Sequence, residues 1–295
     1  MQVAIMRRAI SPAPFVSHVH GTTVGASLTS DVGRAARPFS VGTSLAREKL
    51  TWRLSDRVVA VSDNIATELR SSYGVPGDKI VVVYNGVDVD VFRPVKARDE
   101  IRKSLGWQGR KVALFVGRVG PLKGIKYLID AARIVRTRHE DVLFVVVGGV
   151  EKYQGKEAVS HLAELKEKVE FSAMTDFFVF AGGVPNSKLP EVYSAADLFV
   201  FPSLYEGMPK AVLEAMSCEK PCVATCVGGI PALVGPDEGI LVPPANAEEL
   251  AAGIEEVLAD DGRAERMGKQ AREKIVENFT WSSAARKLLE VYREL

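Results

Sequence analysis

The segment YEGMPKAVLE, residues 205–214, contains two glutamates whose side chains could bind the two ends of one ligand. Glu206 and Glu214 have seven residues between them, and Gly207 and Pro209 favour the start of a helix there. Backbone amides at a helix start attract negative charge, and carboxylates accept hydrogen bonds from hydroxyl groups. The segment therefore suits a ligand with a phosphate at its centre and hydroxyls on both sides, such as a nucleotide sugar.

A second interpretation of the segment needs no ligand. Glu206 could be an acidic residue that precedes a helix, and Glu214 a polar residue about two turns inside it. The amides of Met208, Lys210 and Ala211 would then be ordinary donors of a first helical turn. The segment alone leaves both interpretations open.

Another loop, VGRVGPLKG at 116–124, carries two cations after an apolar run. Gly117 and Gly120 allow close approach of the backbone, and Arg118 and Lys123 bring positive charge to the same rim. Paired cations suit a diphosphate because charge-assisted hydrogen bonds are strong. Glycine at a strand end and lysine at a helix start are also common in purely structural loops, so this loop alone is a weak signal.

The elements that must position these loops alternate along the chain. Continuous apolar runs predict buried strands at 15–21, 57–62, 79–86, 111–117, 142–148, 177–182, 198–202, 221–225 and 239–242. Amphipathic patterns predict helices at 63–74, 123–137, 156–169, 187–196, 208–217, 247–259, 262–277 and 281–295.

This alternation indicates an α/β fold with parallel sheets covered on both faces. Ligands of such sheets bind beyond the carboxyl ends of the strands, where both loops lie. A third loop at that edge, TCVGGIPALVG at 225–235, could bring backbone amides to a ligand or could be a structural turn.

Composition and charge narrow the class of protein. The 295 residues allow one large domain or two ordinary ones, and 47% apolar with 25% charged residues is typical of a globular protein. A net charge of +1 gives no reason to expect nucleic acid. The first 57 residues carry eight Lys/Arg against three Asp/Glu, which could favour an anionic membrane surface or simply be a solvated face.

Location and thiol chemistry follow from the apolar runs and the cysteines. No run reaches the roughly 18 residues that span a bilayer, and the first arginines follow the initial apolar stretch, the reverse of a signal peptide. We therefore expect a cytoplasmic protein, peripheral to the inner membrane face at most. The spacing of Cys218, Cys222 and Cys226 does not fit a zinc site and predicts small buried thiols.

The order and content of the three loops resemble the retaining glycosyltransferases of the GT-B fold, specifically glycosyltransferase family 4 (glycosyl transferases group 1). The resemblance covers residues 15–295 through FVGRVGPLKG, YSAADLFVFPSLYEGMPKAVLEAM, KPCVATCVGGIPALV and GILVPPANAEELAAGI. It implies two doubly wound Rossmann-like domains with parallel sheets. These are a partial acceptor-side domain at 1–95, a nucleotide-sugar donor-binding domain at 96–280, and a helix at 281–295 that crosses back to the first domain. The first domain is expected to be incomplete, because the family's first strand and glycine-rich loop are absent.

The resemblance implies catalytic roles for four residues. Arg118 and Lys123 would hold the donor diphosphate, and Glu206 would bind the transferred sugar. His20 in HVHGT would face the reaction centre, although it could also be an ordinary strand residue. Glu214 would take the ribose hydroxyls. The donor-binding residues implied are Gly117, Arg118, Lys123, Gly182, Gly183, Val184, Glu206, Gly207, Met208, Pro209, Lys210, Ala211 and Glu214.

The activity implied is transfer of a hexosyl group from a UDP- or GDP-linked sugar to an unknown glycan, lipid or small-molecule acceptor, with retention of configuration. No metal would be required, because Arg118 and Lys123 supply the charge. An alternative is a non-catalytic fragment that binds a nucleotide sugar, since the glycine-rich loop region is missing. A third alternative is a sugar-nucleotide epimerase of the same fold. The residues on either side of the two glutamates resemble those of epimerases less than those of glycosyltransferases. Glu219 stands where the family usually has glycine, which predicts backbone strain in a turn.

Overall fold

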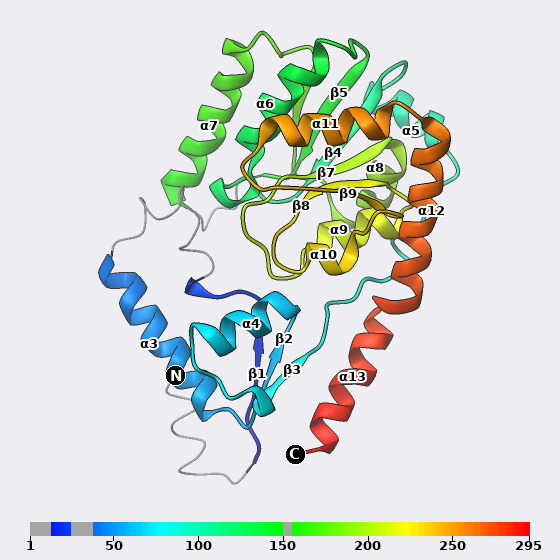
Figure 1. The fold of residues 1–295 in the computed structure, drawn as a ribbon. Coiled ribbons are helices and arrows are strands. Elements are labelled where there is room, and N and C mark those ends of the chain that lie inside the picture. Colours follow the sequence, from blue (N-terminus) through cyan, green and yellow to red (C-terminus); the bar gives the residue numbers. More distant parts are fainter. Residues whose placement is uncertain (1–12, 25–37, 150–154) are drawn as a thin grey trace.

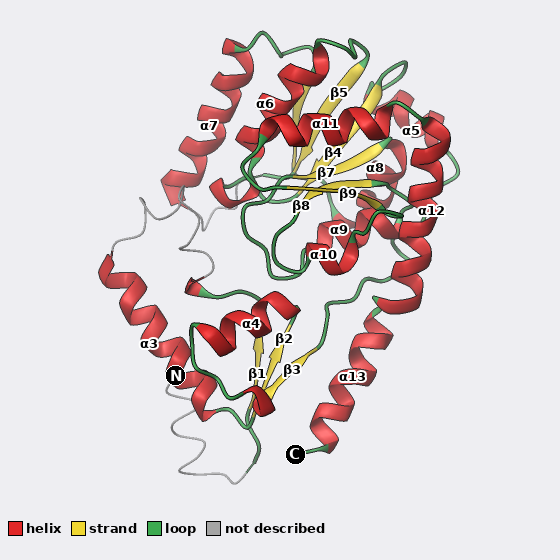
Figure 2. Cartoon of the chain, viewed as in Figure 1, coloured by secondary structure: helices red, strands yellow, loops and turns green. Residues whose placement is uncertain are grey.

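Two parallel sheets organise the molecule, which is described by a computed structural model over residues 13–24, 38–149 and 155–295. One sheet has three strands and the other six, and helices cover both, as Figure 2 shows. Every strand pair in both sheets is parallel. The predicted α/β fold with parallel sheets is therefore confirmed.

The smaller sheet contains the strands β1 (Val16–Val19), β2 (Arg57–Ala60) and β3 (Ile80–Val82), in that order. Helix α3 (Pro38–Leu54) connects the first two strands, and α4 (Asp63–Ser71) follows the second. Helix α4 begins where predicted because the side chain of Ser62 accepts a hydrogen bond from the Ile65 amide at its N-terminus. Helix α3 was not predicted.

The larger sheet has the strand order β6-β5-β4-β7-β8-β9. Its strands are β4 (Lys111–Val116), β5 (Val142–Val147), β6 (Phe178–Gly182), β7 (Leu198–Phe201), β8 (Cys222–Thr225) and β9 (Gly239–Val242). Strands β5, β7 and β8 are buried along their whole length, as their continuous apolar sequences predict. Because the chain order reverses between β4 and β7, the carboxyl ends of these two strands flank the crevice where doubly wound sheets bind ligands.

Two layers of helices enclose the larger sheet (Figure 1). On one face α6 (Ile125–Arg136) packs against α7 (Gly155–Phe171) and α11 (Ala247–Leu258). On the other face α8 (Leu189–Ala195) packs against α5 (Arg98–Leu105) and α9 (Lys210–Ser217), and α9 also packs against α12 (Asp261–Asn278). The short helix α10 (Ile230–Leu233) contacts α9.

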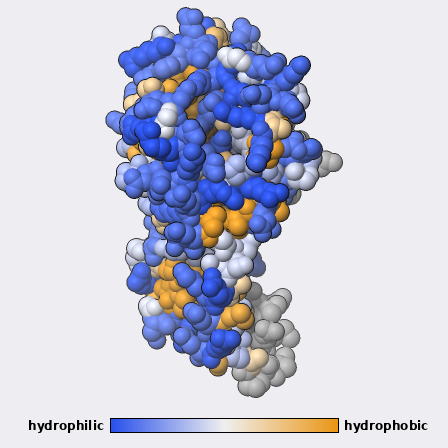
Figure 3. Space-filling model, turned by 90° about the vertical axis from the view of Figure 1, so that its right-hand side faces the viewer, coloured by the Kyte–Doolittle hydropathy of each residue, from blue (hydrophilic) through white to orange (hydrophobic). Residues whose placement is uncertain are grey.

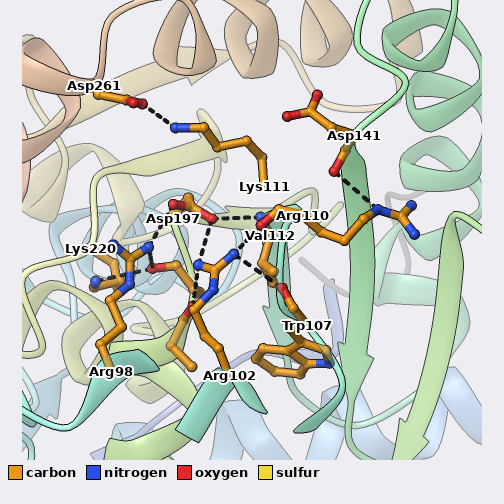
Figure 4. Close-up of polar contacts among 12 residues, drawn as sticks. Arg98, Arg102, Trp107, Arg110, Lys111, Val112, Asp141, Asp197, Lys220 and Asp261 are labelled. Atoms are coloured by element: carbon orange, nitrogen blue, oxygen red, sulfur yellow. Dashed lines mark hydrogen bonds and ion pairs between the residues drawn. The ribbon is translucent and has the colours of Figure 1, made fainter. Parts of the chain in front are cut away.

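The amino ends of β4 and β7 are held together by the carboxylate of Asp197 (Figure 4). Arg98 and Arg102 of α5 donate to it at 2.6 and 3.1 Å, and the amide of Val112 donates at 2.7 Å. Burial would raise the pKa of Asp197, but the Val112 amide and the two arginines lower it below its usual value. The cluster fixes α5 to the edge of the sheet opposite the candidate ligand site.

Helix α13 (Trp281–Arg293) leaves the larger unit and packs on the smaller sheet (Figure 1). Its Val291 forms a separate apolar cluster with Val59 and Val83. The two chain segments that connect the units lie side by side, because Val87 pairs with Thr280. A Cβ atom at Gly86 would overlap the backbone of Thr280, so glycine permits this close approach.

Three finer expectations concern β3, the cysteines and Glu219. Strand β3 is shorter than the strand predicted at 79–86. Cys218 and Cys222 are buried as predicted, but Cys226 is exposed, so the prediction was wrong for this thiol. The predicted strain is confirmed at Glu219, which has φ 58°, in the left-handed region.

The surface and the first part of the chain bear on the predicted membrane contact. Four of the basic residues of that part lie outside the described residues: Arg7, Arg8, Arg34 and Arg37. Figure 3 views the molecule from the side of α12 and α13, where the larger unit is mostly hydrophilic and more apolar surface lies on the smaller one. No helix within the described ranges combines the length and apolar character that crossing a membrane requires.

Candidate functional site

The loops after β4 and β7 are in direct contact at the point where the strand order reverses. The amide of Leu204 donates to the carbonyl of Leu122 at 2.8 Å. Gly124 has φ 66°, and a Cβ atom there would overlap the carbonyl oxygen of Pro202. Glycine is therefore needed at 124 both for the left-handed backbone and for the approach of the two loops.

These loops and the segment that follows β1 line a partly open cavity of about 290 Å³. The residues that line it are His20, Arg118, Gly120, Pro121, Leu122, Lys123, Tyr205, Glu206 and Gly207. Four residues given catalytic roles from the sequence thus meet around one cavity, although His20 comes from the smaller unit and the other three from the larger one.

Glu206 and Lys123 form an ion pair inside this cavity. Lys123 Nζ lies 2.5 Å from Glu206 Oε1, and Ser203 Oγ donates to the same oxygen at 2.7 Å. The side chains of Lys123 and Glu206 are 19% and 10% exposed, so the pair is largely removed from water. An ammonium group has three donors, so Lys123 can contact an anion while it remains paired with Glu206.

His20 lines the same cavity from the segment that follows β1. Burial lowers the pKa of its imidazole, and the neighbouring charges of His18 and Lys210 lower it further. The ring is therefore neutral near pH 7 and can accept a hydrogen bond or a proton.

Glu214 lies apart from Glu206. Helix α9 begins at Lys210, with Pro209 at its N-cap, so Glu214 stands one turn inside the helix rather than the predicted two. It is not among the residues that line the cavity. Its Oε2 accepts a hydrogen bond from the Tyr193 hydroxyl at 2.9 Å. Burial raises the pKa of Glu214, whereas this hydrogen bond and the charge of Lys210 lower it by less.

The backbone between the two glutamates is held by its neighbours. The carbonyl of Met208 accepts from Asn85 Nδ2 at 3.0 Å, which ties this segment to the smaller unit. The Gly229 amide donates to the carbonyl of Gly207 at 2.8 Å, and a Cβ atom at Gly228 would overlap the carbonyl of Glu206. The Gly-Gly turn of the third loop therefore supports the segment 206–207 structurally. Ala211 lies in the first turn of α9, next to Lys210.

The remaining predicted residues lie along the carboxyl edge of the sheet. Gly117 directly follows β4, and its amide donates to the carbonyl of Val147 at 2.9 Å. The Gly148 amide in turn donates to the carbonyl of Gly182 at 2.7 Å. Gly117, Gly182, Gly183 and Val184 are near this edge but do not line the cavity.

The sequence interpretation missed Ser203, Tyr205 and Thr22. Ser203 and Tyr205 lie in the loop between the end of β7 and Glu206, and this closeness in the sequence was the available signal. Thr22 contacts Tyr205 across 183 positions of the sequence, which no local pattern reveals.

Family models match almost all of the chain. The model described as glycosyl transferases group 1 matches residues 97–274, and the one described as glycosyltransferase family 4 matches residues 2–91. An uncharacterized glycosyltransferase of Methanocaldococcus jannaschii is 32% identical, over 95% of this chain and 69% of the relative. Alpha-maltose-1-phosphate synthase of Mycolicibacterium smegmatis is 33% identical, over 84% of this chain and 65% of the relative. The chain thus spans about two thirds of the length of these curated relatives.

Solved structures share the fold. Sucrose-phosphate synthase from Thermosynechococcus elongatus superimposes with a TM-score of 0.87 at 28% identity, over 99% of this chain and 70% of that one. The Anabaena protein HepE, solved with UDP and glucose, gives a TM-score of 0.86 at 23% identity, over 99% and 74% of the two chains. The arrangement of both sheets is therefore that of GT-B glycosyltransferases.

Proposed function

The chain belongs to the glycosyl transferases group 1 family, and we propose that it moves a hexosyl group from a nucleoside diphosphate sugar to an acceptor with retention of configuration. The observation that carries this proposal is the cavity where Arg118, Lys123, Glu206 and His20 meet at the reversal of strand order. The structure of HepE, which was solved in complex with UDP-glucose, supports a nucleotide sugar as the donor.

Arg118 and Lys123 would bind the diphosphate of the donor. Both line the cavity, and Lys123 is held there by Glu206 at 2.5 Å before any ligand binds. The negative charge on the diphosphate grows as the glycosidic bond breaks. Two cations fixed in a partly desolvated site would stabilise that charge, and such stabilisation is the largest catalytic contribution in many enzymes.

In the proposed reaction the bond between sugar C1 and the diphosphate oxygen breaks, and a bond between C1 and the acceptor oxygen forms on the same face. The acceptor proton passes to the departing phosphate oxygen, so the products are the glycosylated acceptor and the nucleoside diphosphate. Glu206, oriented by Lys123 and Ser203, would accept a hydrogen bond from a hydroxyl of the transferred sugar. The neutral imidazole of His20 would contact the sugar from the opposite side.

The proposal for Glu214 rests on the family resemblance. A carboxylate one turn inside α9 can accept hydrogen bonds from two ribose hydroxyls, and Tyr193 orients it at 2.9 Å. The glycines at the ends of β4 and β6 would let the nucleoside approach the backbone, and Val184 would flank it. The amides of Gly207, Met208, Lys210 and Ala211 would meet the sugar hydroxyls and the phosphate.

We propose that the reaction needs no metal ion, because Arg118 and Lys123 already place two positive charges beside the diphosphate. Turnover should therefore be the same in excess EDTA and in excess Mg²⁺. A loss of turnover in EDTA that Mg²⁺ restores would overturn this part of the proposal.

Calorimetric titration with UDP, GDP and ADP tests the donor site, and release of the diphosphate from UDP-glucose or GDP-mannose tests transfer. We expect one nucleoside diphosphate to bind and the corresponding sugar nucleotide to be consumed. Binding without turnover across a panel of glycan, lipid and small-molecule acceptors would favour the alternative, a binding module that transfers nothing. If no nucleoside diphosphate binds, both functions fail. The acceptor, the cytoplasmic location and any membrane contact stay predictions.

A further inference from the structure

A hydrogen-bonded cluster joins the two units directly beside the candidate site. Tyr205 follows β7 of the larger sheet, Thr22 follows β1 of the smaller sheet, and Glu68 lies on α4. The Thr22 amide lies 3.0 Å from the Tyr205 hydroxyl oxygen, which itself lies 3.2 Å from Glu68 Oε2. Thr22 Oγ1 donates to the same carboxylate oxygen at 2.5 Å. One hydroxyl and one carboxylate thus connect the two units.

The bonds of Tyr205 have fixed directions. An amide N–H can only donate and an ionised carboxylate can only accept, so the Tyr205 oxygen accepts from Thr22 and donates to Glu68. Burial raises the pKa of Tyr205 to about 12, with Glu68 adding to the rise and Thr22 opposing it, so the hydroxyl keeps its proton. A phenylalanine could make neither bond, and it would remove an acceptor from the amide of Thr22, a residue only 4% exposed.

The backbone around this cluster is equally close. A Cβ atom at Gly207 would overlap the carbonyl oxygen of His20, and one at Gly21 would be 3.9 Å from the Tyr205 ring. The segments 20–22 and 205–207 therefore lie against each other. His20 precedes Thr22 by two residues, and Glu206 directly follows Tyr205. The contact between Tyr205 and Thr22 is therefore adjacent to both His20 and Glu206.

We propose that Tyr205 is a positioning residue, whose hydroxyl sets the distance across the cavity between His20 and the Glu206–Lys123 pair. The inference rests on the proposed function, because that distance matters only if a sugar is transferred between these groups. Tyr205 acts through Thr22 and Glu68 on the placement of His20, whereas Arg118 and Lys123 of the larger unit bind the diphosphate. Its loss should therefore reduce turnover without weakening nucleotide binding.

The test compares Tyr205→Phe with the wild-type chain, using UDP and GDP for binding and UDP-glucose and GDP-mannose for turnover. We expect kcat to fall by about tenfold or more, because a lost hydrogen bond to a charged group and a displaced catalytic group each have effects of this size. The Kd of the nucleoside diphosphate and the KM of the donor should stay within about threefold. Glu68→Gln keeps a carbonyl acceptor for Tyr205 and Thr22, and it should lose less kcat than Glu68→Ala.

Hydrogen exchange measures the positioning itself. Exchange at the Thr22 amide should be about tenfold faster in Tyr205→Phe, while exchange in the strands of the larger sheet stays unchanged. Tyr292→Phe is the matched control, since its hydroxyl is in a half-exposed side chain and lies 3.5 Å from His18 Nε2. It should leave both kcat and Thr22 exchange unchanged.

The outcomes separate the two proposals. An active wild-type chain with unchanged kcat or unchanged Thr22 exchange in Tyr205→Phe would overturn the positioning role alone. A parallel loss of UDP or GDP binding, or unfolding at the assay temperature, would also overturn it, because Tyr205 would then be needed for the fold. A wild-type chain that binds no nucleoside diphosphate would overturn the proposed function and the inference that depends on it.

Discussion

Among single residues, Lys123 is the one held most firmly at the proposed anion site. Its ammonium group is paired with Glu206 at 2.5 Å and lies 5.5 Å above the ring of Phe201. Holding a long side chain in one place before binding removes part of the entropy cost that a ligand would otherwise meet. Glu206 is oriented by the same contact, so the charge that would bind phosphate also directs the carboxylate that would bind the sugar.

Replacing Lys123 with alanine should weaken the binding of UDP or GDP. A hydrogen bond to a charged group contributes about 1.5–3 kcal/mol, so we expect Kd to rise by about 10- to 100-fold. Lys166→Ala removes the same charge from an exposed position on α7 and serves as the control. Equal Kd values for the two variants would show that Lys123 does not contact the diphosphate.

The stability of the protein should depend on pH through His20. Its pKa in the folded chain is lowered from 6.5, so the unfolded chain binds the proton more readily. The contribution of the neutral ring is thus complete above pH 6.5 and is lost as the pH falls from 6.5 through the folded pKa. His20→Gln should therefore show a smaller decrease in Tm between pH 7.5 and 5.0 than the wild type. His139→Gln makes the same substitution on the far side of the larger unit and serves as the control. An equal decrease in Tm in the wild type and both variants would contradict the role of His20.

At the scale of helices and strands, the sequence predicted most of the larger unit. Its strands are continuous apolar runs, of which β5, β7 and β8 are buried along their whole length, and helices such as α6 have a clear amphipathic period. Helix α3 was missed because PFSVGTSLAREKLTWRL mixes apolar and polar residues without a helical period. The loops were harder still. The sequence assigned Glu206 and Glu214 to one ligand clamp, whereas only Glu206 is among the residues that line the cavity.

Gly124 should tolerate substitution poorly, because it has φ 66° and lies against the carbonyl of Pro202. Gly124→Ala combines backbone strain with a steric overlap, and we expect it to lower the free energy of unfolding by about 2 kcal/mol or more. Gly120→Ala provides the control in the same loop, since Gly120 has extended backbone and no atom within 4 Å of the added Cβ. Urea denaturation measures both, and similar midpoints would show that the two loops can separate at little cost.

The molecule as a whole is joined at several points, which explains why a site can form between its units. Asn85 holds the carbonyl of Met208, Thr22 holds Tyr205, and Val87 pairs with Thr280. Each of these contacts links residues more than 120 positions apart, so periodicity and local motifs could not predict them. The sequence therefore indicated which residues could do chemistry, but the geometry that brings His20 to the other three depends on the packing of the whole chain.

Helix α13 should be needed to stabilise the smaller sheet. Val291 is 3% exposed and packs with Val59 and Val83, so Val291→Asp would bury an unpaired charge against them. We expect a loss of about 3 kcal/mol or more of unfolding free energy, together with faster proteolysis of the smaller unit. Val276→Asp places the same charge on α12 at a side chain that is 44% exposed, and it should have little effect. Protection of residues 38–83 from protease in both variants would argue against this role.

The packing of α13 on the smaller sheet also has a consequence for biosynthesis. Residues 57–83 leave the ribosome some 200 residues before residues 281–293, and about 10–40 s separate the two events at typical rates of synthesis. During that interval Val59 and Val83 have no helix to cover them, because α13 follows directly after the last helix of the larger unit. The apolar face formed by Val59 and Val83 therefore stays uncovered until translation reaches the last helix.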